Sequence, residues 1–261
     1  MEADNWNIKV EKIKQKIIDA GKIGLQHFRS HPINVIEKTT FYEIVTEQDI
    51  EMEELIKEEI LKNFPGSFIL AEESPTEVEG DFWTVDPLDG TSYYQKGLSD
   101  WSVNVAYIKN KEVVLAITYC PVADELFYSE KGKGAYLNGE RIYVSDTSDL
   151  KNACFFFGYN YLRNFNDPKS IQFRSGFRTI WSTGSTALAL ANLAAGRVDV
   201  GIQINQSFWD ITGMLHVTEA GGKFTNWKDG TDFEHSASQV NNFCATNGKL
   251  HALVMDSLAE K

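Results

Sequence analysis

Six consecutive residues, Asp86-Pro-Leu-Asp89-Gly90-Thr91, hold the side chains best suited to chemistry in this chain. They follow Phe82-Trp-Thr-Val85, an apolar and β-branched run that predicts a buried strand ending before Asp86. Two carboxylates this close repel each other unless a cation lies between them, and a divalent metal suits such oxygen ligands. Gly90 lets the backbone approach a ligand, and Thr91 can begin a helix whose N–H groups favour an anion. The stretch therefore predicts a metal-assisted phosphatase.

The structural alternative for these residues is a strand-to-helix turn with an aspartate cap. Spacing excludes two rival motifs: the nucleophilic Asp-x-Asp-x-Thr of one phosphatase superfamily needs one residue between its aspartates, and here there are two. An EF-hand calcium loop needs alternating acids and a glutamate at its twelfth position, which are missing. The sequence also lacks Gly-x-x-x-x-Gly-Lys-Ser/Thr and Gly-x-Ser-x-Gly, so P-loop and serine-hydrolase interpretations lose their basis.

A second acidic pair, Glu72-Glu73, follows a predicted strand at Phe68–Ala71. Successive strand residues point to opposite sides, so only one of the two acids is expected to face a site directly. The structural alternative is a solvated acidic turn before Ser74-Pro75.

Two further acids fit helix starts. Asp49 forms a capping-box pattern with Thr46, where a second helix is predicted to begin. It lies in an acidic run, in which such acids complement the helix dipole; the run also contains Glu47, Glu51, Glu53 and Glu54. Asp210, next to Trp209, likewise fits the N-terminal acid of a helix predicted at about 209–220.

Composition limits the class of protein. The net charge of −12 argues against nucleic acid as a main partner, because phosphate backbones need basic surfaces. No apolar run approaches the roughly 20 residues of a membrane helix, so no membrane association is expected. The acidic start of the chain does not resemble a secretory signal. Together with reduced, structural thiols expected at Cys120, Cys154 and Cys244, it predicts a cytoplasmic protein.

The pattern of elements predicts one compact catalytic unit with two closely packed halves. Residues 1–148 are predicted as an α+β half that carries metal-site carboxylates, with an amphipathic helix at about 6–28 and antiparallel strands joined by a hairpin at Lys109-Asn-Lys111. Residues 149–261 are predicted as an α/β half that completes the metal and substrate site. The elements expected there are a strand at Cys154–Phe157, a polar loop around Asp167-Pro168, helices at about 185–195 and 209–220 with a strand at 198–202 between them, and a glycine cap at Gly221-Gly222.

Across most of its length, the chain resembles the inositol monophosphatase family of Mg²⁺-dependent, lithium-sensitive phosphatases. The segments that carry the resemblance are Val45-Thr46-x-x-Asp49, Ala71-Glu-Glu-Ser74, Trp83-x-x-Asp86-Pro-Leu-Asp-Gly-Thr91, Lys131-Gly-x-Gly134, Gly184-Ser185, and Trp209-Asp210 leading to Thr218-Glu-Ala-Gly-Gly222. The resemblance implies a layered α-β-α-β-α sandwich of the inositol monophosphatase and fructose-1,6-bisphosphatase type. It also implies a homodimer, a small phosphorylated substrate, and two or three Mg²⁺ ions.

By this resemblance, Glu72, Asp86 and the carbonyl of Leu88 would hold one Mg²⁺, and Asp86, Asp89 and Asp210 a second. Glu73 and Asp49 would serve a further, weaker metal or its waters, while Thr91 and Glu72 would orient and deprotonate a metal-activated water for in-line attack. Oxygen ligands without cysteine or histidine favour Mg²⁺ or Mn²⁺ over zinc, and His216 is expected to pack inside the fold. The substrate contacts implied are Asp89, Gly90, Thr91, Gly184, Ser185, Thr186, Gln203 and Asp210.

Two departures bear on the substrate. Gln203 stands where the family often has a glutamate for inositol hydroxyls, and Trp181 stands where relatives commonly have arginine. An amide lacks the carboxylate charge and adds a donor, and the Trp181 ring could stack on a sugar or base or simply pack. Inositol monophosphate is therefore the leading substrate. Fructose 1,6-bisphosphate, adenosine 3′,5′-bisphosphate and the 2′-phosphate of NADP are alternatives, and a non-catalytic regulatory binding protein is the alternative from another class.

Overall fold

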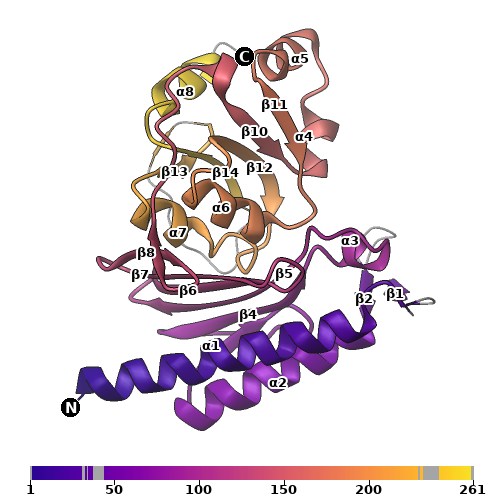
Figure 1. Ribbon diagram of the computed structural model, residues 1–261, viewed down its shortest axis with the longest axis vertical. Helices are drawn as coiled ribbons and strands as arrows, with labels where there is room; N and C mark the ends of the chain where they lie inside the picture. Colours follow the sequence, from indigo (N-terminus) through magenta and orange to yellow (C-terminus); the bar gives the residue numbers. More distant parts are fainter. Residues whose placement is uncertain are drawn as a thin grey trace.

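The computed structural model describes residues 2–30, 33, 35–37, 44–228, 230–231 and 241–259, whose elements form stacked layers (Figure 1). Two long helices cover one face of a seven-stranded sheet, and a second pair of helices lies between that sheet and a five-stranded sheet. Further helices pack on the outer face of the smaller sheet. This arrangement confirms the predicted layered α-β-α-β-α sandwich.

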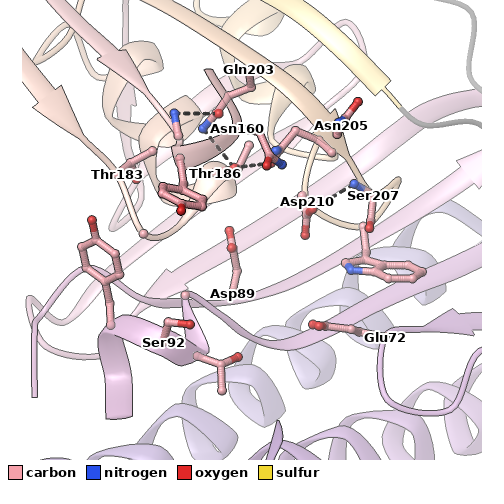
Figure 2. A pocket seen from close by; sticks show the side chains of 18 of the residues that line it. Glu72, Asp89, Ser92, Asn160, Thr183, Thr186, Gln203, Asn205, Ser207 and Asp210 are labelled. Atoms are coloured by element: carbon pink, nitrogen blue, oxygen red, sulfur yellow. Dashed lines mark hydrogen bonds between the residues drawn. The ribbon is translucent and has the colours of Figure 1, made fainter. Parts of the chain in front are cut away.

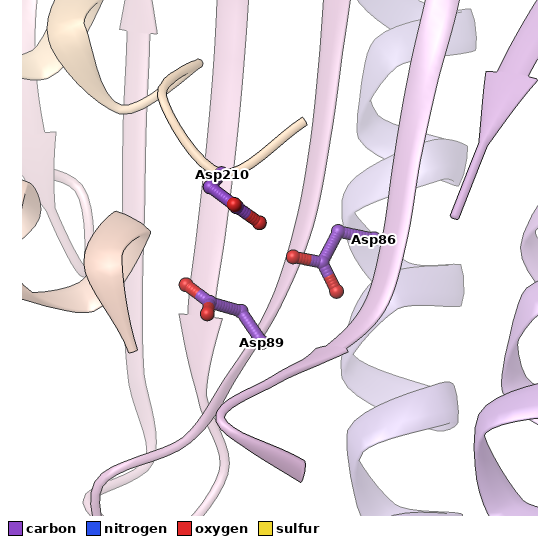
Figure 3. Close-up of side chains that lie close together, drawn as sticks. All are labelled: Asp86, Asp89 and Asp210. Atoms are coloured by element: carbon purple, nitrogen blue, oxygen red, sulfur yellow. The ribbon is translucent and has the colours of Figure 1, made fainter. Parts of the chain in front are cut away.

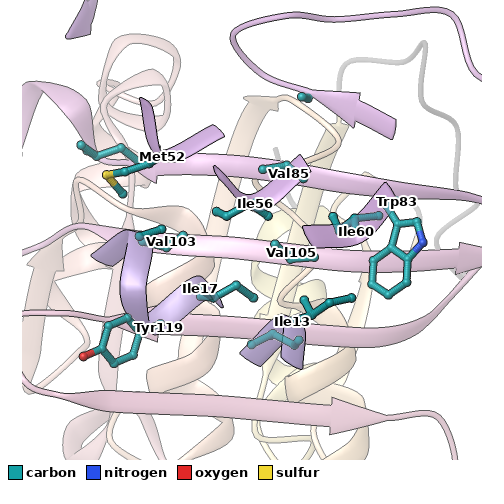
Figure 4. Close-up of a cluster of buried hydrophobic side chains, with 14 of the residues drawn as sticks. Ile13, Ile17, Met52, Ile56, Ile60, Trp83, Val85, Val103, Val105 and Tyr119 are labelled. Carbon is teal, nitrogen blue, oxygen red and sulfur yellow. The ribbon is translucent and has the colours of Figure 1, made fainter. Parts of the chain in front are cut away.

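The outermost layer consists of α1 (Glu2–His27) and α2 (Glu47–Asn63). Their apolar faces, including Ile13 and Ile56, pack on Val85 and Val105 of the large sheet (Figure 4). Short strands β1 (Val35–Glu37) and β2 (Ile44–Thr46) pair just before α2. Thr46 is the N-cap of α2 in a capping box, as predicted, and the first helix begins earlier than predicted, at Glu2.

The large sheet has the strand order β3-β4-β5-β6-β7-β8-β9, in which β3 is parallel to β4 and every other pair is antiparallel. Asn110 and Lys111 have φ of 51° and 64° in the β5–β6 turn, the left-handed geometry of tight hairpins, which confirms the predicted hairpin. The strands are β3 (Phe68–Ala71), β4 (Phe82–Asp89), β5 (Ser102–Lys109), β6 (Glu112–Cys120), β7 (Glu125–Glu130), β8 (Gly134–Leu137) and β9 (Glu140–Ile142).

The smaller sheet has the order β11-β10-β12-β14-β13, with β10 parallel to both of its neighbours. Alternate side chains of β10 belong to two hydrophobic cores. Phe156 packs toward the middle helices, whereas Phe155 and Phe157 pack toward the outer helices. The strands are β10 (Cys154–Phe157), β11 (Thr179–Ser182), β12 (Val200–Gln206), β13 (Lys223–Asn226) and β14 (Asn241–Thr246).

The remaining helices correct two predictions. The segment around Asp167-Pro168 is not a plain loop, because Asp167 caps a helix and Pro168 occupies its first position, where no backbone N–H is needed. The helix predicted at about 209–220 begins only at Met214, after a series of turns. These helices are α3 (Thr91–Gln95), α4 (Tyr159–Asn164), α5 (Pro168–Ser175), α6 (Thr186–Ala194), α7 (Met214–Glu219) and α8 (His251–Ala259).

Three smaller expectations are also settled. The glycine cap of α7 is confirmed, since Gly221 has φ of 91° and the N–H of Gly222 donates to the Val217 carbonyl at 2.8 Å. Cys120, Cys154 and Cys244 form no disulfide. Within the described part of the chain, every helix is too short or too polar to cross a bilayer.

Candidate active site

Asp86 and Asp89 lie inside β4 rather than beyond its end, which corrects the predicted strand boundary. In a regular strand, residues three apart point to opposite faces. Here the pairing of β4 with β5 is irregular, because Asp86 lies opposite Asn104 while Asp89, three residues on, lies opposite Ser102. The extra residue in β4 forms a bulge, which changes the alternation and lets both carboxylates face the same site.

Asp210 reaches the same place from the second half of the chain. It lies in the turns between β12 and α7, where its Oδ2 accepts a hydrogen bond from the Ser207 N–H at 3.0 Å. Asp86, Asp89 and Asp210 each offer an oxygen within 4.8 Å of the others (Figure 3). Asp210 is therefore a turn residue rather than the first acid of a helix, and the structure gathers three of the predicted metal ligands.

The electrostatics of this group favour a bound cation. Burial raises the pKa of Asp86 well above its usual range, and the charges of Glu72, Asp89 and Asp210 raise it further. Oδ1 of Asp86 accepts the Leu88 N–H at 3.1 Å, whereas the buried Oδ2 has no hydrogen-bond partner among the described residues. A cation would satisfy this oxygen and relieve the repulsion, and a set of carboxylates alone suits a hard ion such as Mg²⁺.

Asp89 is held by the start of α6. Its Oδ2 accepts hydrogen bonds from the Ser185 hydroxyl and the Ala187 N–H, each at 2.8 Å. Burial raises the pKa of Asp89 to about 7, although these two hydrogen bonds lower it. Ser185, predicted to contact substrate, is fully buried and also caps α6. The structure thus places Ser185 behind Asp89 rather than on the cleft surface.

Asp89 and Asp210 line a cleft with a volume of about 710 Å³ between the large sheet and the second half of the chain, while buried Asp86 is not among the described lining residues. Glu72, which follows β3, lines this cleft with Asp89 and Asp210, and all three side chains point into it (Figure 2). Glu72 is not one of the three acids in the tight group, but its charge raises the pKa of both Asp86 and Asp89. Glu73 is half-buried and is not among the described residues that line the cleft.

Gly90 and Thr91 form the floor beside these acids. Gly90 has φ of 101°, and a Cβ there would lie 2.7 Å from the Asp100 carbonyl oxygen, so the turn requires glycine. The Thr91 hydroxyl lies 3.0 Å from the Leu88 carbonyl and 3.3 Å from Oδ1 of buried Asp49. Asp49 also accepts the Thr46 N–H at 2.9 Å, so it both caps α2 and contacts Thr91. Thr91, predicted to orient the water, and Asp49, predicted to serve a weaker metal, are therefore direct neighbours.

Gln203 lies on the opposite wall in a chain of hydrogen bonds (Figure 2). Its Oε1 accepts the Gly158 N–H at 2.7 Å, and its Nε2 donates to the Thr186 hydroxyl at 3.2 Å. That hydroxyl donates in turn to Oε1 of Gln206 at 2.6 Å. Gln203 is only 1% exposed, so its main effect on the wall is to fix Gly158 and Thr186 through these hydrogen bonds.

Other wall residues were missed or lie elsewhere than predicted. Gly184 lines the cleft, but its N–H donates to Oδ2 of Asp100 at 2.7 Å. Trp181 does not appear among the described lining residues and packs near the Phe156 ring, which favours the packing alternative. The lining residues that sequence reasoning did not identify include Tyr93, Tyr159, Asn160, Asn205, Ser207 and Trp209. Only the adjacency of Trp209 to Asp210 pointed to any of them.

The chain is similar to known proteins over most of its length. A model of the inositol monophosphatase family matches residues 6–261. A Thermotoga maritima protein called fructose-1,6-bisphosphatase/inositol-1-monophosphatase is 37% identical over 228 residues, which is 87% of each chain. A Xylella fastidiosa protein called Nus factor SuhB is 31% identical, with coverage of 80% of this chain and 78% of its own. The solved structure of an IMPase from Thermotoga maritima superposes with a TM-score of 0.87 at 34% identity, covering 100% of this chain and 98% of that one.

Proposed function

Because the chain belongs to the inositol monophosphatase family of phosphatases, we propose that it hydrolyses a small polyol phosphate, inositol monophosphate above all, with Mg²⁺ as cofactor. The observation that carries this proposal is the meeting of Asp86, Asp89 and Asp210 beside a polar cleft. A phosphate dianion is repelled by such an acidic site unless cations are bound there. The acids that hold the cations would therefore also create the phosphate site.

The proposed ligands are those that the resemblance to the family implies, and their oxygen donors suit Mg²⁺. Glu72, Asp86 and the Leu88 carbonyl would hold one Mg²⁺, and Asp86, Asp89 and Asp210 a second, with Mn²⁺ as an expected substitute. Asp49 and Glu73 would serve a third, weaker site or its waters. When bound, paired divalent cations stabilise the charge on the attacking and leaving oxygens and lower the pKa of water.

The residues of the chain supply the proton transfers and the orientation. The Thr91 hydroxyl has one proton, which it can donate to Asp49 or to the Leu88 carbonyl. Its lone pairs then accept a hydrogen bond from the attacking water and direct that water toward phosphorus. Glu72, which points into the cleft, would take the second proton of this water as the general base. As the new bond to phosphorus forms, the bond to the leaving oxygen would break, and the proton held by Glu72 would pass to that oxygen to release the alcohol. The backbone N–H groups of Gly90 and Thr91 would bind the phosphate oxygens.

The opposite wall supports a neutral, polyhydroxylated substrate body. Asn160, Thr186 and Asn205 offer amide and hydroxyl groups, while Tyr159 and Trp209 offer rings against which a sugar or polyol can pack. No lysine, arginine or histidine occurs among the described residues that line the cleft. A second phosphate would therefore gain no ion pair from these side chains.

Fructose 1,6-bisphosphate is the second candidate substrate, because the name of the Thermotoga maritima relative joins both activities. Phosphate release with Mg²⁺ tests the proposal on inositol 1-phosphate, fructose 1,6-bisphosphate, NADP and adenosine 3′,5′-bisphosphate. We expect inositol 1-phosphate to have the highest kcat/KM and chelation of the metal to abolish turnover. A higher kcat/KM for any other substrate of the panel would contradict the inositol assignment.

The catalytic assignment itself is tested by Asp86→Asn, with Asp81→Asn as the matched control. Asp81 precedes β4, lies outside the described lining of the cleft, and accepts a hydrogen bond from the Asn110 N–H at 2.9 Å. Only Asp86→Asn should lose turnover. Turnover of Asp86→Asn near that of the wild type would refute the assignment of catalysis to these acids.

A further inference from the structure

Glu53 is a buried carboxylate that the proposed chemistry does not use. Its side chain is 2% exposed and lies on α2, four residues after Asp49. Residues four apart share one face of a helix, so Asp49 and Glu53 point in the same general direction. That face meets two segments of the site: the turn after β4, through Thr91, and the turn after β3, through Glu73 and Ser74.

The contacts of Glu53 all involve that second turn or a nearby lysine. Oε2 accepts the backbone N–H of Glu73 at 2.8 Å, and Oε1 accepts the hydroxyl of Ser74. Lys57, one turn further along α2, has its Nζ 3.7 Å from Glu53 Oε1 and 2.8 Å from the Ser74 hydroxyl. The buried charge is therefore paired and hydrogen-bonded, the condition under which such a group is tolerated.

Glu72 lies between this contact and the end of a strand. Its own N–H donates to the Val85 carbonyl at 3.1 Å, which continues the pairing between β3 and β4 by one residue. The next N–H, that of Glu73, is held by Glu53. Glu72 is thus fixed by the sheet on one side and by α2 on the other, with its carboxylate directed into the cleft.

We infer that Glu53 is a positioning residue, which fixes the turn that aims Glu72 and thereby sets the affinity of the site for a divalent cation. This inference rests on the proposed function, since it takes Glu72 as a metal ligand. Residues behind a metal ligand that hold it in place change metal affinity by about 10–100-fold when they are removed. Glu53 acts through the backbone rather than on the carboxylate of Glu72, so the lower end of this range is expected.

The test is calorimetric titration of the metal-free protein with Mn²⁺, which requires no substrate and no turnover. Glu53→Ala should weaken Mn²⁺ binding by about tenfold. The Mn²⁺ affinity of Glu53→Gln should lie between those of Glu53→Ala and the wild type, because the glutamine amide oxygen still accepts the Glu73 N–H. Glu54→Gln is the matched control: it removes the neighbouring acid, 58% exposed, which accepts from the same Lys57 at 2.7 Å. An exposed pair contributes little, so Glu54→Gln should bind Mn²⁺ within about twofold of the wild type.

A purely structural role makes a different prediction. It would lower the urea midpoint of Glu53→Ala but leave Mn²⁺ affinity of the folded protein unchanged, and that result would overturn the inference. If Glu53→Ala does not fold, Glu53→Gln decides in the same way: a dissociation constant equal to that of Glu54→Gln overturns the inference. A wild-type protein that binds no Mn²⁺ at all would refute the metal site itself, and with it the proposed function.

Discussion

His216 should make the stability of this protein fall in mild acid. It is fully buried on α7, where Nδ1 lies 2.8 Å from the Ser129 hydroxyl and Nε2 lies 3.2 Å from the Thr118 hydroxyl. Burial lowers the pKa of His216 from 6.5 to about 3. Below pH 6.5 the unfolded chain therefore binds a proton at His216 that the folded protein does not bind. The free energy of unfolding falls as pH falls from 6.5 toward 3.

The magnitude follows from the two pKa values. The loss is about 1.4 kcal/mol for each pH unit below 6.5, which makes about 2 kcal/mol by pH 5 and about 5 kcal/mol by pH 3.

Urea unfolding of metal-free protein at several pH values provides the assay, with His216→Gln as the comparison. Glutamine can hydrogen-bond both hydroxyls but does not titrate, and the other titrating groups are common to both proteins. Relative to His216→Gln, the wild type should lose about 2 kcal/mol between pH 6.5 and pH 5. Parallel pH profiles for the two proteins would refute the reasoning.

Three further predictions concern the cleft. Asp86→Asn should lower turnover by more than about a hundredfold, because the loss of a ligand shared by two cations should have a larger effect than the loss of a residue behind a ligand. The variant should also bind Mn²⁺ more weakly than the wild type, and an unchanged Mn²⁺ titration would contradict the ligand assignment. Gly158→Ala would place a Cβ 2.4 Å from Oε1 of Gln203. It should lower the free energy of unfolding by about 1–3 kcal/mol and raise KM, whereas an unchanged urea midpoint and KM would count against the close contact. Thr91→Val should lower kcat about a hundredfold with little change in thermal stability, while Thr76→Val, which loses a hydroxyl outside the cleft, should keep full activity.

Local signals made part of the fold predictable from the sequence. β3 and β10 have the predicted bounds because uninterrupted apolar runs define them. The capping box at Thr46 and the glycine cap of α7 also follow from local chemistry. The acids of the site were found for the same reason: their residue types and motif spacing are visible in the sequence.

The errors arose where tertiary structure overrides the local pattern. β4 continues through Pro87 to Asp89, although proline lacks the N–H of a regular strand residue, because the bulge leaves that residue outside regular pairing. The helix predicted from Trp209 begins only at Met214, since Asp210 is held in a turn by the Ser207 N–H. Glu53 looked like one acid of a helix start, and only the structure brings it to Glu73. The homodimer, the cytoplasmic location and the lithium sensitivity stay predictions.

The bulge in β4 has a consequence for how this chain can vary. Loss of a single residue between Asp86 and Asp89 would restore regular pairing with β5, and the two acids, then two residues apart, would still share one face of the strand. The bulged backbone would be lost, and with it the local contacts in which the Leu88 N–H donates to Oδ1 of Asp86 and the Leu88 carbonyl lies 3.0 Å from the Thr91 hydroxyl. A substitution elsewhere in the cleft changes one side chain, whereas a change of length in these few residues would remove several backbone contacts of the site together.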